Sequence, residues 1–119
     1  VLESARHAAV PEAQLGKLEL VLEEILLNII RHGYSPDQQG RISVSCGPAA
    51  PGEVRVDIRD WGRPFDPLQA DPPDLTLSLS QRQIGGLGIF LTLELTDRRA
   101  YTRVDGHNVF SFCFPRRAS

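Results

Sequence analysis

The sequence predicts an α+β domain, a two-layer sandwich with helices on one face of a mainly antiparallel sheet. The first observation is a helical repeat of apolar residues over 15–31, with a second, shorter apolar segment at 87–95. The second observation is a set of short alternating segments, which we expect to be strands, at 41–46, 53–60, 100–104 and 108–114. The chain therefore runs helix, two strands, loop, helix, two strands, an order typical of this architecture.

The segment 15–31 is the strongest helical prediction. Pro11 suits the first turn of a helix, and Gly33 is placed to end it. The periodic apolar residues are Leu15, Leu18, Leu22, Ile25 and Ile29. Further apolar residues widen this stripe, so we expect the helix to be covered on more than one side: Leu20, Val21, Leu26, Leu27 and Ile30.

The four strand segments read as two hairpins. Residues 48–52 form the turn of the first hairpin, and Asp105 with Gly106 forms a strong turn signal in the second. Apolar residues recur at every second position, which predicts that they share the core face of the sheet: Val54, Val56, Ile58, Phe110, Phe112 and Phe114. Residues 67–83 lack any period, and a loop of this length in a compact domain is usually functional.

Length and composition limit the possible functions. The 119 residues are expected to form a single domain over 1–119, with 41% hydrophobic and 24% charged residues. A formal net charge of −2 argues against a nucleic-acid-binding protein. No apolar run approaches the roughly 20 residues that cross a membrane, and no signal peptide is visible. Cys46 and Cys113 are expected to be free thiols in a reducing cytoplasm.

Four polar residues fall on one edge of the first helix: Glu24, Asn28, Arg31 and His32. The amide oxygen of Asn28 suits Mg²⁺, and Glu24 could accept a proton from an attacking hydroxyl. Arg31 or His32 could offset phosphate charge. The alternative is an ordinary solvated helix edge.

The second candidate is Asp60, which ends a predicted strand, with Gly62 two residues later. A carboxylate there can accept a hydrogen bond from the exocyclic amine of adenine, while glycine allows the base to approach the backbone. Guanine presents a carbonyl at that place, which an aspartate would repel. The alternative is an ordinary turn, where Asp and Gly are common.

The third candidate is the glycine run at Gly85, Gly86 and Gly88, just before the second helix. Backbone N–H groups at a helix N-terminus can bind phosphates. No GxxxxGK[ST] sequence occurs, which excludes a P-loop, and no strand precedes the glycines as a dinucleotide-binding fold requires.

Together, these three motifs resemble the GHKL (Bergerat-fold) ATPases, and within them the anti-sigma-factor serine/threonine kinases. Residues 24–34 resemble the family's N box, 60–67 its G1 box and 86–91 its G2 box. The resemblance runs from about Leu15 to Pro115 and implies a Bergerat ATP-binding fold with ATP and Mg²⁺ as cofactors. Two features depart from the family. No first strand is visible before the opening helix, so the chain can be a piece of a longer protein. His107 and Asn108 stand near the place of a usual threonine.

The resemblance also implies roles for individual residues. Glu24 matches the catalytic base, Asn28 the Mg²⁺ ligand and Asp60 the adenine-binding acid, while 66–84 matches the mobile ATP lid. The residues expected to contact the nucleotide are Asn28, Arg31, His32, Asp60, Gly62, Phe65, Gly86, Leu87 and Gly88.

The implied function is that of an ATP-dependent serine/threonine kinase and anti-sigma regulatory factor, which transfers the γ-phosphate to a serine of an anti-sigma-factor antagonist. A cytoplasmic homodimer is expected, with a sigma factor as a further candidate partner and with no nucleic acid or membrane. Two alternatives remain open. One is an ATP-binding module that sequesters a partner without kinase turnover. The other is the catalytic domain of a two-component histidine kinase.

Overall fold

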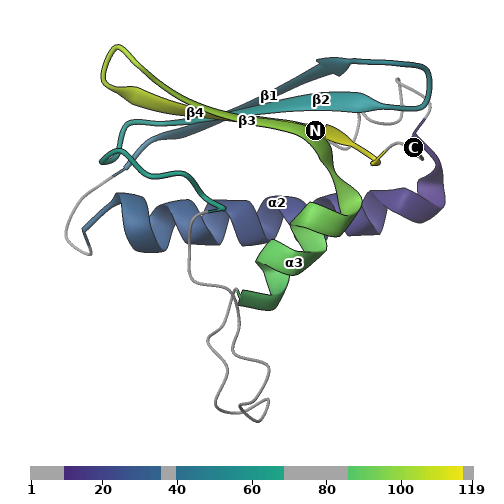
Figure 1. Ribbon diagram of the computed structural model, residues 1–119, viewed down its shortest axis with the longest axis horizontal. Helices are drawn as coiled ribbons and strands as arrows, with labels where there is room; N and C mark the ends of the chain where they lie inside the picture. Colours follow the sequence, from purple (N-terminus) through teal and green to yellow (C-terminus); the bar gives the residue numbers. More distant parts are fainter. Residues whose placement is uncertain (1–9, 36–39, 69–85, 117–119) are drawn as a thin grey trace, which may run out of the picture.

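The computed structural model describes residues 10–35, 40–68 and 86–116, and its four strands form one antiparallel sheet in the order β1-β2-β4-β3. The elements in chain order are α2 (Glu12–Gly33), β1 (Ile42–Pro48), β2 (Val54–Asp60), α3 (Gly86–Leu95), β3 (Asp97–Val104) and β4 (His107–Phe114). Both helices lie on the same face of the sheet (Figure 1). The predicted two-layer α+β fold is therefore confirmed.

Helix α2 begins just after Pro11 and ends at Gly33, close to the predicted limits. Its buried apolar residues follow one stripe toward the sheet: Leu15, Leu18, Val21, Ile25 and Ile29. The expectation that α2 is covered on more than one side is wrong for three residues. Leu20, Leu27 and Ile30 are 42%, 38% and 53% exposed. Their positions turn away from the sheet, and no described element covers them fully.

The two predicted hairpins are present, and they join in the middle of the sheet. The turn between β3 and β4 uses Asp105 and Gly106, both with positive φ (47° and 80°). Such a turn matches the right-handed twist of the flanking strands. Strands β2 and β4 pair so that Asp60 lies directly opposite Asn108. This long-range pairing brings residues 48 apart in the sequence to one end of the sheet.

The core lies between α2 and the central strands. Val54, Val56 and Ile58 of β2 face α2 together with the alternate phenylalanines of β4, as predicted. Burying a side chain of this size contributes about 2 kcal/mol. Cys113 is buried and Cys46 half-buried, and neither forms a disulfide. Because the core residues of β2 pack against α2, the end of this strand is held against the helix, and the position of Asp60 is fixed.

Some predictions fall on residues outside the described ranges. Of the expected lid, residues 66–84, only 66–68 are described. Within the described ranges, no helix combines the length and apolar character needed to span a bilayer.

Candidate functional site

Asp60 is a buried carboxylate at the last position of β2, with 2% of its surface exposed. Its Oδ1 accepts a hydrogen bond from the backbone N–H of Gly62, at 3.0 Å, and a second from Nδ2 of Asn108, at 2.9 Å. A buried carboxylate is costly unless hydrogen bonds compensate for lost water. These two donors therefore both stabilise the side chain and fix its direction.

The loop after Asp60 touches the end of α2 through two glycines. A Cβ atom at Gly62 would overlap the carbonyl oxygen of Gly33, so this position requires glycine. The same carbonyl accepts a hydrogen bond from the backbone N–H of Arg63, at 3.0 Å, and the carbonyl of His32 accepts one from the Arg63 guanidinium. The G1-like loop and the C-terminal end of α2 are consequently held together as one unit.

Asn28 lies one helical turn before this contact and is 4% exposed. Its Nδ2 donates to the carbonyl oxygen of Pro67, at 3.2 Å, which ties α2 to the start of the expected lid. Its Oδ1 accepts no hydrogen bond from any residue that the structure describes. The amide oxygen is therefore available to an external ligand, as the Mg²⁺ hypothesis requires.

Glu24 lies one turn earlier on α2 and contacts the first turn of α3. Gly86 begins α3, Leu87 follows, and the Glu24 side chain occupies the place that a Cβ atom on Gly88 would take. The Oε2 atom of Glu24 is buried and has no hydrogen-bond partner among the described residues. Because buried polar atoms in native proteins are nearly always paired, this oxygen is a candidate for contact with a ligand.

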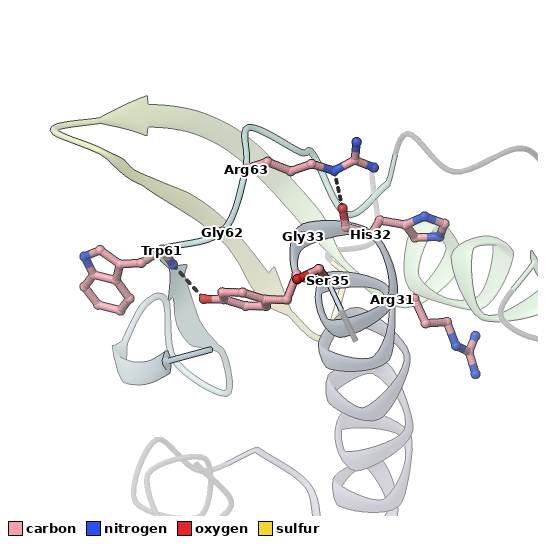
Figure 2. Close-up of a pocket in the computed structure, with 8 residues that line it drawn as sticks. Arg31, His32, Gly33, Ser35, Trp61, Gly62 and Arg63 are labelled. Carbon is pink, nitrogen blue, oxygen red and sulfur yellow. Dashed lines mark hydrogen bonds between the residues drawn. The ribbon is translucent and has the colours of Figure 1, made fainter. Parts of the chain in front are cut away.

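The remaining predicted residues lie near the end of α2. The His32 ring stacks on Phe65, with centroids 4.9 Å apart. A cavity of about 600 Å³ opens here, lined by Arg31, His32, Gly33, Tyr34, Ser35, Trp61, Gly62 and Arg63. In Figure 2, Trp61 extends to one side of the end of α2, and His32 and Arg31 extend to the other. Glu24, Asn28 and Asp60 are not among the lining residues of this cavity.

Sequence reasoning assigned no site role to three residues that hold the loop after Asp60 in place: Asn108, Tyr101 and Arg103. Asn108 donates to Asp60 and to the carbonyl of Arg63, at 2.8 Å, and accepts from the Tyr101 hydroxyl. The Arg103 guanidinium donates to the carbonyl of Gly62, at 2.7 Å. The signal was available, because a polar residue opening an otherwise apolar strand needs a buried partner. Finding the partner required the β2–β4 register.

His107, which the sequence interpretation left without a role, is half-buried and stacks on Trp61 at 5.4 Å. The Arg41 guanidinium lies 3.8 Å from the Trp61 ring centre. The Tyr34 hydroxyl accepts a hydrogen bond from the backbone N–H of Trp61, at 2.9 Å, and donates to the carbonyl of Arg41, at 2.6 Å. These contacts brace Trp61, and with it the start of the loop after Asp60, against Tyr34, Arg41 and His107.

Helix α2 is the element that connects the three sequence motifs. On α2, Glu24 contacts Gly88 of the third motif. Asn28 contacts Pro67, the last residue of the second motif, and Gly33 contacts Gly62. The folded chain thus places the Asp60 carboxylate beside the end of α2, and on α2 itself the Asn28 amide oxygen and Oε2 of Glu24, to which no described residue donates. Such a set can bind an amine at one end and a metal–phosphate group farther along.

Comparison with known proteins identifies the family. The model of the histidine kinase-like ATPase domain matches residues 1–114. The chain belongs to this family. It is 35% identical over 91 residues to the serine/threonine-protein kinase BtrW of Bordetella bronchiseptica. That match covers 76% of this chain and 63% of the relative, so the chain spans less than two thirds of the relative's length.

Among solved structures, the chain resembles the histidine kinase domain of the blue-light activated histidine kinase EL346 from Erythrobacter litoralis. The TM-score is 0.58 at 19% identity, and the match covers 89% of this chain and 46% of the other. At this identity the likeness establishes the fold. It agrees with the family assignment, and it leaves the roles of the individual site residues as predictions.

Proposed function

We propose that this domain is an ATP-dependent serine/threonine protein kinase that transfers the γ-phosphate of ATP to a serine of a partner protein. The observation that carries the proposal is the buried, unpartnered Oε2 of Glu24, held against Gly88 at the first turn of α3. A general base in this place would stand between the helix N-terminus, where phosphates bind, and the attacking hydroxyl.

Asp60 is proposed to bind the adenine ring. Its carboxylate is buried at the end of the sheet, and two donors hold its Oδ1. It would accept a hydrogen bond from the adenine amine and repel the carbonyl that guanine presents there. Because the unmatched polar group would be left buried, discrimination between the two bases can be strong.

Asn28 is proposed to hold Mg²⁺ through Oδ1, and the site fits such an ion. The oxygen makes no hydrogen bond with the described residues, and a hard cation prefers oxygen ligands. When bound, Mg²⁺ would neutralise charge on the phosphate oxygens. Arg31, on the exposed side of the same helix turn, and His32 would supply further positive charge near the phosphates. Glu24 would take the proton of the attacking serine.

The proposed protein substrate is an anti-sigma-factor antagonist, with a sigma factor as a further partner. Support comes from the 35% identity to a serine/threonine-protein kinase and from the His32-Gly33-Tyr34 end of the first motif, which resembles the anti-sigma branch. The proposal includes a cytoplasmic homodimer, as in the branch that the sequence resembles.

The decisive experiment compares Glu24→Ala with Glu23→Ala, because Glu23 is the exposed neighbour on the same helix. We expect Glu24→Ala to bind ATP normally and to lose transfer to the partner by about a hundredfold or more, the usual contribution of a general base. Glu23→Ala should retain transfer. Radiolabel transfer and calorimetry provide the two measurements. Undiminished transfer by Glu24→Ala would refute the catalytic role.

The chemical form of the product separates the proposal from its alternatives. An acid-stable phosphoserine on the partner supports the serine kinase. An acid-labile phosphohistidine would instead indicate the catalytic domain of a two-component kinase. A partner that binds in the presence of ATP without any gain in mass would indicate a sequestering module.

A further inference from the structure

We infer that Asn108 is a positioning residue that sets the base selectivity of the proposed ATP site by holding Asp60 in one orientation. This inference rests on the proposed nucleotide-binding function. Asn108 is 1% exposed and lies in β4 directly opposite Asp60 of β2. It is a polar residue on the core face of a strand whose next core-facing residues are phenylalanines. A polar group buried in this way needs a specific reason.

The hydrogen bonds of Asn108 use its whole side-chain amide. Nδ2 donates to Oδ1 of Asp60 and to the carbonyl of Arg63, at 2.9 and 2.8 Å. Oδ1 accepts from the Tyr101 hydroxyl and from the backbone N–H of Phe65, the latter at 3.4 Å. An amide offers two N–H donors and one oxygen with two lone pairs, so each is matched.

This saturation fixes the direction of the amide. If the group flipped, its oxygen would face the carboxylate of Asp60 and the carbonyl of Arg63, two acceptors. Its NH₂ would face the backbone N–H of Phe65, a donor. A flipped amide would therefore lose at least three hydrogen bonds and gain repulsions. The observed orientation always presents an N–H group to Asp60.

The consequence for Asp60 is that its two oxygens become different. Oδ1 already accepts from Gly62 and Asn108, which occupies both of its lone pairs. No described residue donates to Oδ2. One oxygen in a fixed direction is left to receive a ligand, and it matches a single amine donor. A carboxylate free to rotate would present this acceptor in several directions and discriminate less.

A packing role alone predicts a different behaviour. If Asn108 only filled space, changes to it would alter stability and weaken all nucleotides alike. A positioning role changes the ratio of ATP to GTP affinity, because only the amine-bearing base uses the directed oxygen. The ratio is therefore the informative quantity.

The experiment measures ATP and GTP dissociation constants by calorimetry on the full chain. Asn108→Leu and the smaller Asn108→Ala both remove the donor toward Asp60. Each should lower the ATP preference by about tenfold or more, as loss of a hydrogen bond to a charged group implies. Asn108→Thr supplies a hydroxyl donor and should keep the preference within about threefold of the unmodified chain.

Ser111→Ala is the matched control. Ser111 is buried in the same strand but lies on the opposite face of the sheet, where it accepts a hydrogen bond from Arg55. It should leave the ATP to GTP ratio unchanged. If Asn108→Leu fails to fold, Asn108→Ala decides, since it inserts no new atoms and no second carboxyl group beside Asp60.

The outcomes distinguish failure of the positioning role of Asn108 from failure of the proposed ATP-binding function. If the unmodified chain binds ATP with a preference over GTP, and both donor-free variants keep it, the role of Asn108 is overturned while the proposed function stands. If the unmodified chain binds no ATP, the proposed function and this inference fail together.

Discussion

The two ends of the proposed nucleotide site differ in how completely the folded chain satisfies them. At the C-terminal end of α2, the loop after Asp60 is held by backbone and side-chain hydrogen bonds from α2, β3 and β4. In the middle of α2, Asn28 makes one hydrogen bond and Glu24 holds a buried oxygen without a partner in the described structure. The loop after Asp60 is therefore preorganised by the folded chain, whereas the middle of α2 retains acceptor atoms to which no described residue donates.

The largest expected effect on stability tests the contact between the loop after Asp60 and the C-terminal end of α2. Gly62→Ala would place a methyl group on the carbonyl oxygen of Gly33, and two packed backbone segments would have to separate. We expect a loss of about 3 kcal/mol in the free energy of unfolding, at the upper end for overpacking. Urea denaturation measures it.

Gly33→Ala is the control for this change. A Cβ atom there would meet its nearest neighbours at 3.7 and 3.8 Å, which is ordinary contact. Its effect should stay within about 1 kcal/mol. Equal destabilisation by both variants would show that the backbone contact is not the cause.

An intermediate effect tests whether the Tyr34 hydroxyl braces Trp61 in the loop after Asp60. Tyr34→Phe removes the hydroxyl that links the N–H of Trp61 to the carbonyl of Arg41. Leaving the partly buried N–H of Trp61 without a partner should cost about 1 kcal/mol in the free energy of unfolding. The amide of Trp61 should also exchange faster with solvent deuterium. An unchanged exchange rate would contradict the bracing role.

The smallest expected effect on stability tests the contact between Glu24, in the middle of α2, and Gly88 of α3. Gly88→Ala overlaps Cγ, Cδ and Oε2 of Glu24, a flexible side chain that can change rotamer, so we expect a loss below about 1 kcal/mol. Combined with Glu24→Ala, the loss should disappear, because the overlapping atoms are gone. A double-mutant cycle on unfolding free energies measures this coupling. Additive losses would indicate that Gly88 is needed for another reason.

Much of the fold was predictable because periodicity reports local geometry. Helix α2 and the four strands appeared near their expected positions, and the positive φ values of Asp105 and Gly106 follow from the turn they form. Sequence spacing also placed Glu24 and Asn28 one turn apart on a single helix. These relations depend only on neighbours along the chain.

The rest depended on contacts between distant segments. The pairing of Asp60 with Asn108 follows from the register of β2 against β4, which no local pattern reveals. The closeness of Gly62 to the end of α2 likewise required the packed backbone. The exposure of Leu20, Leu27 and Ile30 was mispredicted because apolar character alone does not say whether another element lies above a helix face.

The environment of Trp61 has a practical consequence. It is the chain's only tryptophan, and its indole contacts the Arg41 guanidinium and the His107 ring on the loop that follows Asp60. Its fluorescence therefore reports on this loop alone, without any introduced dye. A change in emission during titration with a nucleotide would give a label-free signal from the loop after Asp60, suited to stopped-flow recording.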